Sequence, residues 1–123
     1  MIVVFDAPDQ PMVFAEVAEN DFEHHFGLMF DDNIADGRGM LFVFDHPQQL
    51  RFTMTNTPIS LDMVFMGADG KVLGVEEMTE PLSTRLIGTR QDAQYVLEVP
   101  GGWTANNSVV PGTQAFFVEG DVA

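Results

Sequence analysis

The sequence predicts an all-β fold, a single-domain antiparallel β-sandwich or partly closed barrel of about eight strands with one short helix near residues 20–26. Three observations lead to this expectation. The chain has 123 residues, which suits one domain spanning residues 1–123. Hydrophobic residues make up 46% of the chain and include 11 Phe, enough to fill a core. Short apolar runs separated by turn residues recur along its whole length.

The expected strands follow these apolar runs, many of which are rich in Val, Ile and Phe. Residues 69–70, an Asp-Gly pair between two runs, give the strongest hairpin signal, and residues 45–47 are interpreted as another hairpin turn. Strand alternation predicts that only one of Leu41 and Phe42 faces the core. In chain order the runs are 2–5, 12–17, 39–44, 50–54, 61–66, 72–75, 95–99 and 115–118.

Helical signals are confined to two segments. Asn20 is a suitable N-cap for the 20–26 helix, and Glu23 follows it three residues later, as in a capping box. Residues 103–108 form a second, shorter candidate that requires tertiary packing. Between the later strands, residues 79–93 are predicted to be a long polar connection, and such loops are often functional.

Charge and composition exclude several functional classes. Five Lys and Arg stand against 19 Asp and Glu, a net charge of −14, so we expect neither a nucleic-acid partner nor an anionic membrane surface. The absence of Cys excludes disulfides, thiolate zinc sites and cysteine nucleophiles. Residues 2–5 do not form an export signal, and the longest apolar run, 40–44, is too short for a transmembrane segment. We therefore expect a soluble protein, cytoplasmic or assembled into a particle.

Four motifs in succession resemble a known family. They are GLM at 27–29, GMLFVF at 39–44, FTMTNTPISLD at 52–62 and YVLEV at 95–99. Their order is similar to that of the family called domain of unknown function 192, over about residues 14–118. The resemblance implies a compact β-sandwich or barrel-like domain with a short helix, and it implies no established activity.

Four positions differ from what the resemblance leads us to expect. His24 and Asp31 stand where family members often carry Arg, Thr53 where they often carry Trp, and Thr55 where they often carry Lys. If the basic residues of the family line an anion-binding pocket, this chain should bind the same ligand poorly, because its replacements are neutral or negative near pH 7.

The candidate ligand-binding residues are Asn56, Thr57, Asp62 and Arg51. Asp62 lies in an apolar run and is expected to be partly buried, so its carboxylate needs hydrogen-bond donors. It either orients a ligand, with Asn56 and Thr57 as donors, or accepts hydrogen bonds from backbone N–H groups of a turn, and we favour the second interpretation. Arg51 could supply a remaining anion contact.

We expect no metal site, no cofactor and no catalytic residue. His24 and His25 are adjacent, so on a helix their rings point about 100° apart and cannot both face one metal ion without distortion. The pairing of Asp45 with His46 lacks an identifiable nucleophile.

Three functional hypotheses from different classes remain open. The first is a non-enzymatic binding or interaction module that engages a protein or small ligand near residues 56–62 and 79–93. The second is a structural component that docks onto a larger assembly, such as a viral or cell-surface particle, and an exposed apolar patch would favour it. The third is a small hydrolase-like or lyase-like enzyme, which requires Asp62 and a histidine to converge in one pocket.

Overall fold

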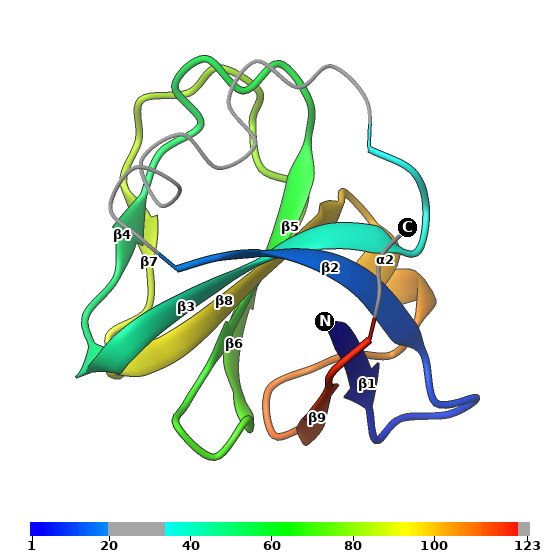
Figure 1. Cartoon of the computed structure of the whole chain (residues 1–123). Helices are drawn as coiled ribbons and strands as arrows, with labels where there is room; N and C mark the ends of the chain where they lie inside the picture. Colours follow the sequence, from blue (N-terminus) through cyan, green and yellow to red (C-terminus); the bar gives the residue numbers. More distant parts are fainter. Residues whose placement is uncertain (20–33, 121–123) are drawn as a thin grey trace.

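The computed structural model describes residues 1–19 and 34–120 (Figure 1). These residues contain nine strands and one short helix, and all eight predicted runs are found as strands. The predicted helix at 20–26 lies outside the described residues, and the shorter candidate at 103–108 contains α2. The elements are β1 (Ile2–Phe5), β2 (Met12–Ala18), β3 (Arg38–Gln48), β4 (Arg51–Phe52), β5 (Leu61–Met66), β6 (Val72–Glu76), β7 (Ile87–Gly88), β8 (Ala93–Pro100), α2 (Trp103–Asn106) and β9 (Ala115–Val118).

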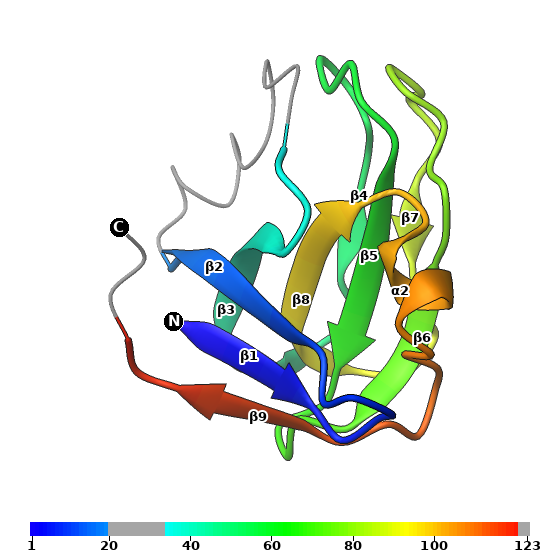
Figure 2. The same ribbon diagram turned by 90° about the vertical axis from the view of Figure 1, so that its right-hand side faces the viewer.

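Seven strands form one sheet in the order β6-β5-β8-β3-β2-β1-β9, and β4 and β7 form a second, two-stranded sheet. The large sheet curls so that its two edges meet (Figure 2). Lys71, just before β6, forms a bridge with Gln114, just before β9. The amide of Val72 donates to the carbonyl of Thr113 at 2.8 Å, and Ala115 donates to Gly70 at 3.0 Å. The fold is therefore the partly closed barrel form of the predicted all-β class.

Most neighbouring strands pair antiparallel, but β2 and β3 are parallel, from Phe14 opposite Arg38 to Ala18 opposite Phe42. A parallel pair needs a crossover of a dozen or more residues, because the chain must return to the same end of the sheet. Residues 19–37 supply that length. This pair is the exception to the antiparallel sheet predicted from the sequence.

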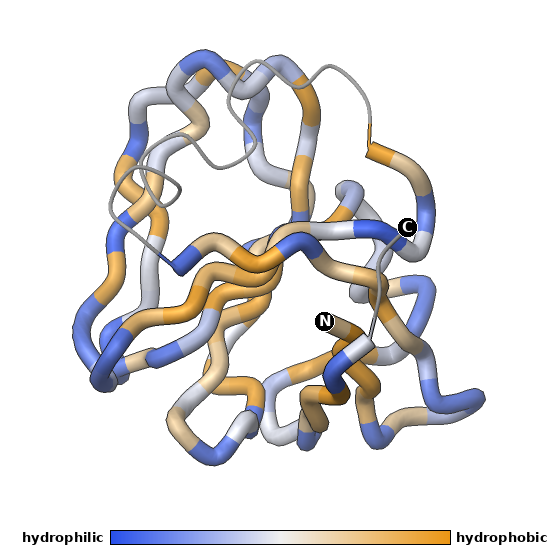
Figure 3. The backbone as a smooth tube through the Cα atoms, viewed as in Figure 1, coloured by the Kyte–Doolittle hydropathy of each residue, from blue (hydrophilic) through white to orange (hydrophobic). Residues whose placement is uncertain are grey.

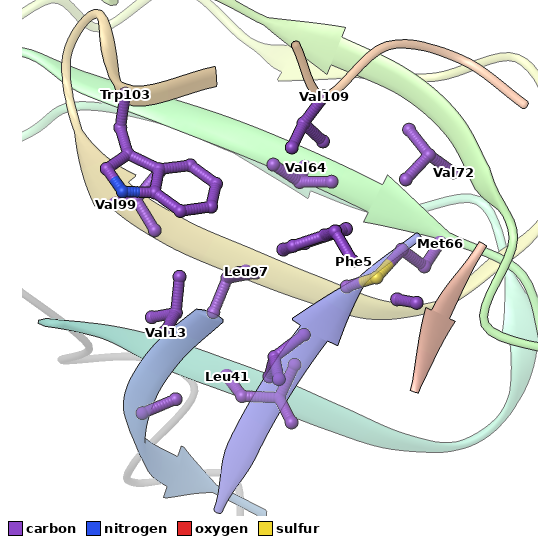
Figure 4. Close-up of a cluster of buried hydrophobic side chains, with 13 residues drawn as sticks. Phe5, Val13, Leu41, Val64, Met66, Val72, Leu97, Val99, Trp103 and Val109 are labelled. Atoms are coloured by element: carbon purple, nitrogen blue, oxygen red, sulfur yellow. The ribbon is translucent and has the colours of Figure 1, made fainter. Parts of the chain in front are cut away.

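The inner core of the barrel draws buried side chains from all seven strands of the large sheet (Figure 4). Trp103 of α2 packs at one end of this core, with its ring centroid 5.8 Å from that of Phe5. Burying such side chains is the main stabilising term of a domain of this size. The strand members are Val3, Phe5, Val13, Ala15, Leu41, Val64, Met66, Val72, Leu97, Val99 and Ala115.

A second core covers the outer face of part of the barrel. Side chains from β2, β3, β5 and β8 pack there against the β4–β7 sheet, and the Phe52 ring lies 5.4 Å from Phe42 and 6.1 Å from Phe65. Leu41 is 1% exposed and Phe42 is 2% exposed. The expectation that only one of them faces the core is wrong, because both faces of the sheet are covered.

Hydrophobic residues gather along the strands, whereas most of the turns are hydrophilic (Figure 3). The predicted hairpin at 69–70 joins β5 to β6, and Gly70 adopts the positive φ of 81° that the turn requires. Residues 45–47 are not a hairpin turn: they lie within β3, where the register with β8 shifts between Val43 and Gln48. The 79–93 connection contains the short strand β7. No helix among the described residues is long and apolar enough to cross a membrane.

Candidate functional site

Asp62, the second residue of β5, is fully buried, and both of its carboxylate oxygens accept hydrogen bonds. Its Oδ1 accepts hydrogen bonds from the amides of Met78 at 2.9 Å and Gly102 at 3.0 Å. Its Oδ2 accepts from the amide of Thr104 at 2.9 Å and from the Thr104 hydroxyl at 2.5 Å. The carboxylate thus holds the start of α2 and the Met78 backbone against β5, as the favoured interpretation of Asp62 as a turn-fixing acceptor expects.

Asn56 and Thr57 lie in the segment between β4 and β5, which is joined to the 79–93 connection. Asn56 is exposed and has a positive φ of 58°, whereas Thr57 is buried. The amide of Leu82 donates to the carbonyl of Thr57 at 3.0 Å, and Met54 donates to Ser83 at 2.9 Å. The structure therefore brings together the two segments that the binding hypothesis combines.

Thr53 and Thr55, at the positions where the sequence departs from the resembled family, bond to each other. The Thr53 hydroxyl donates to the Thr55 hydroxyl at 3.0 Å, and the Thr55 amide donates to Thr53 Oγ1 at 3.4 Å. Both side chains are half-buried and uncharged. His24 and Asp31 lie outside the described residues.

Arg51 and His46 lie away from Asp62. The Arg51 guanidinium donates to the carbonyls of Leu50 at 2.9 Å and Thr89 at 3.2 Å, so it binds the β4–β7 backbone. His46 pairs with the exposed side chain of Asp45 at 2.6 Å. His46 lies beside the start of β8, whereas Asp62 lies opposite Val99 near the end of β8. At about 3.3 Å per residue along a strand, the backbones of His46 and Asp62 are roughly 15 Å apart. His24 and His25 lie outside the described residues.

The sequence analysis did not single out Glu98, which is buried in the middle of the large sheet. It lies on β8 between Leu97 and Val99, whose side chains belong to the inner core, so strand alternation points Glu98 to the outer face. There it is opposite Met40 of β3 on one side and Met63 of β5 on the other. Glu98 as a whole residue is only 5% exposed.

The Glu98 carboxyl has no hydrogen-bond or ion-pair partner within residues 1–19 and 34–120. Burial without compensating donors raises the pKa of Glu98 from 4.5 to about 8, so the group is mostly neutral at pH 7. Buried polar groups in native proteins nearly always have a partner, and strongly shifted carboxyls cluster at functional sites. Glu98 is therefore the strongest candidate for a functional group in the described part of the chain.

The register aligns a row of carboxylates and thioethers across the sheet on the outer face. From β2 to β6 the row runs Glu16, Met40, Glu98, Met63 and Glu76. Glu16 is exposed, and Glu76 accepts from the Arg85 guanidinium at 2.6 Å. Only the central carboxyl is both buried and unpaired among the carboxyls of this row.

The sequence does contain a signal that Glu98 is a buried carboxyl. It is the lone charged residue in the apolar run 95–99, and a carboxylate in such a run is either paired or perturbed. The same argument identified Asp62, which proves to be fully paired. The distinction between them depends on long-range contacts, because the donors to Asp62 come from residues 78 and 102–104.

Comparisons with known proteins agree with this architecture. A crystal structure of a protein of unknown function from Novosphingobium aromaticivorans DSM 12444 matches with a TM-score of 0.91 and 28% identity, over 95% of this chain and 84% of that chain. A protein of Sinorhizobium meliloti 1021, named as a candidate transcription regulator, matches with a TM-score of 0.88 and 29% identity, over 94% of this chain and 91% of that chain. No curated protein matches the chain.

The family comparison covers nearly the whole sequence. The model of domain of unknown function 192 (DUF192), described as an uncharacterized ACR, matches residues 3–117. This span includes every described strand except the first residue of β1 and the last of β9. The chain belongs to the domain of unknown function 192 family.

Proposed function

We propose that the protein is a non-enzymatic binding module whose ligand is held at Glu98, on the outer face of β8. The observation that carries this proposal is a carboxyl group without a partner among the described residues, on a residue that is only 5% exposed. Leaving a buried polar group unpaired costs about 1–3 kcal/mol, which a bound ligand with a complementary group would recover.

The surroundings of Glu98 support a binding role. Met63 opposite Glu98 directly follows the 56–62 segment, which is joined through Thr57 to Leu82 of the 79–93 connection. We retain Asn56 and Thr57 as residues of the binding region, because Asn56 is exposed and Thr57 joins the two segments that the binding hypothesis combines. We assign Asp62 and Arg51 to holding the fold, because their polar atoms already bind backbone groups.

The net charge of −14 also bears on the partner. It opposes the approach of a phosphate backbone, so the regulator description of the Sinorhizobium protein is not carried over to this chain. An enzyme would need a second reacting group beside Glu98 or Asp62. The described histidine, His46, lies several residues along β3 from Met40, the neighbour of Glu98.

Native mass spectrometry of protein purified without refolding tests the proposal. After incubation with the small-molecule fraction of a cell extract, the wild type should carry added mass, and Glu98→Gln should lose it. Glu77→Gln is the matched control, because Glu77 is exposed, and it should keep the added mass. A bare wild type, or equal added mass on Glu98→Gln, would contradict the proposal.

A second candidate function, docking onto a larger assembly, is favoured by an exposed apolar face formed by β1, β2 and β9. The register aligns Met12, Val4 and Phe116 in one row across these strands and Phe14, Ile2 and Val118 in the next. Phe116 is 54% exposed and Met12 is 50% exposed. Contiguous exposed apolar surface is typical of interaction sites.

Cross-linking tests the docking function. A photo-activated cross-linker in place of Phe116 should give a discrete adduct with the assembly in intact cells. The same cross-linker at Thr84, which is also exposed but lies outside this face, should not. Equal adducts at both positions would exclude the face formed by β1, β2 and β9 as a docking site.

A further inference from the structure

We infer that Met78 is a modification site, at which a hydroperoxide oxidises the thioether to a sulfoxide and the hydroxyl of Ser60 then donates to the sulfoxide oxygen. This inference goes beyond the proposed function and does not depend on a ligand at Glu98. It rests on a buried hydroxyl without a partner, on an exposed methionine beside it, and on the backbone contacts that hold the two residues together.

Ser60, the residue before β5, carries the hydroxyl without a partner. Its Oγ is shielded from solvent and makes no hydrogen bond. Buried polar groups in native proteins nearly always have a partner, because a hydroxyl that leaves water loses the hydrogen bonds it made there. The hydroxyl can donate one hydrogen bond, so the group that this position lacks is an acceptor.

The sulfur of Met78 borders the same space as this hydroxyl. The position that a Cβ on Gly101 would occupy lies 2.8 Å from Ser60 Oγ and 3.1 Å from Met78 Sδ. Backbone contacts hold the three residues in place: the amide of Gly101 donates to the carbonyl of Ser60 at 3.0 Å, and the amide of Met78 donates to Asp62 Oδ1 at 2.9 Å. A thioether is a weak acceptor, so the reduced side chain leaves the Ser60 hydroxyl unpaired.

Met78 is also open to a reagent in solution. It is 61% exposed, more than any other described methionine; Met12 is 50% exposed, whereas Met54, Met63 and Met66 are buried. Its φ is 51°, in the left-handed region that residues with a side chain seldom adopt. Backbone strain of this kind is concentrated at functional positions. The fold therefore keeps a strained and exposed methionine beside an unpaired hydroxyl.

Oxidation of Met78 supplies the missing acceptor. A lone pair of Sδ attacks one oxygen of hydrogen peroxide, so that the S–O bond forms and the O–O bond breaks. The proton of the transferred oxygen passes to the leaving hydroxide, which becomes water; the sulfur loses two electrons and the peroxide gains them. The sulfoxide oxygen is a polar acceptor on a flexible, unbranched side chain, so it can turn toward the Ser60 hydroxyl. The product ties residue 78 to the segment that precedes β5.

Treatment of the folded protein with hydrogen peroxide, followed by peptide mass spectrometry, tests the modification. The rate of sulfoxide formation at Met78 should be at least about one third of the rate at Met12, because both residues are exposed. Met54, Met63 and Met66 should react at least about tenfold more slowly than Met78, because they are buried. A lower rate at Met78 than one third of that at Met12 would overturn the assignment of Met78 as a modification site.

Urea unfolding tests the role of Ser60, in protein that carries Met12→Leu so that oxidation is directed to Met78. Untreated Ser60→Ala should have a urea midpoint no lower than that of its parent, because the deleted hydroxyl has no partner. After oxidation at Met78, confirmed by mass spectrometry, the midpoint of Ser60→Ala should fall further than that of the parent.

Ser108→Ala is the matched control, because Ser108 is exposed, and its midpoint should shift on oxidation as that of the parent does. Equal shifts in Ser60→Ala and its parent would overturn the pairing of Ser60 with the sulfoxide. A lower midpoint of untreated Ser60→Ala would overturn the premise that the hydroxyl is unpaired. None of these measurements involves Glu98, so their failure would leave the proposed function standing.

Discussion

Replacing Glu98 by Gln should change how the stability of the protein depends on pH. The side chain is nearly isosteric but cannot ionise. In the folded protein the pKa of Glu98 is about 8, against 4.5 for the unperturbed group. Between these two values the folded state holds a proton that the unfolded state has lost, so the free energy of unfolding of the wild type falls as pH rises. Over an interval of about 3.5 pH units, at about 1.4 kcal/mol per unit, the loss approaches 5 kcal/mol.

Urea unfolding of wild type and Glu98→Gln at fixed ionic strength, from pH 4 to pH 9, measures this effect. The stability of the variant relative to the wild type should be constant below about pH 4.5, rise through pH 5–8 and level off above pH 8. Both proteins share the charge repulsion of this acidic chain, so its effect on the free energy of unfolding largely cancels when they are compared at the same pH. Glu77→Gln should show a nearly constant difference. A flat difference for Glu98→Gln between pH 5 and pH 8 would refute the argument that the carboxyl is buried without a partner.

Three further predictions concern the cores and surfaces. Leu41→Ala and Phe42→Ala should each lower the free energy of unfolding by about 2–5 kcal/mol in urea titrations, because each side chain lies in a separate buried core; a small effect from either one would contradict the two-core description. Asp62→Asn should lower the free energy of unfolding by about 3 kcal/mol, because an amide N–H of Asn would face a backbone N–H. Thr104→Val, which removes only the hydroxyl donor, should lower it by about 1–2 kcal/mol. An Asn variant as stable as the wild type would exclude the role of Asp62 in holding α2 against β5. Phe116→Ser should change stability by less than about 1 kcal/mol, because the ring is mostly exposed; a larger loss would mean that the ring is packed within the protomer.

The strands could be predicted from local sequence because each combines β-branched or aromatic residues with flanking turn residues. The hairpin at 69–70 is a clear case, since an Asp-Gly pair specifies its own backbone geometry. Strand β7 was not predicted, because two residues, Ile87 and Gly88, carry no periodicity. The parallel pairing of β2 with β3 also has no local signal, because it depends on the path of the intervening chain.

The candidate site was only partly predictable for the same physical reason. Alternation along a strand shows that two neighbours point to opposite faces, but it does not show that both faces are covered, as they are at Leu41 and Phe42. Asp62 and Glu98 look alike in the sequence, each a carboxylate within an apolar run. Only the fold supplies Asp62 with amide donors from residues 78, 102 and 104 and leaves Glu98 between two methionines.

Strand β1 pairs with β2 on one side and with β9 on the other, so its two partners come from opposite ends of the described chain. On a ribosome that adds about 5–20 residues per second, β9 emerges on the order of ten seconds after β1. Until then the barrel has an open side, Val3 and Phe5 lack their final cover, and the free edge of β1 can pair with other nascent chains. A chain that stops before Ala115 should therefore aggregate rather than fold.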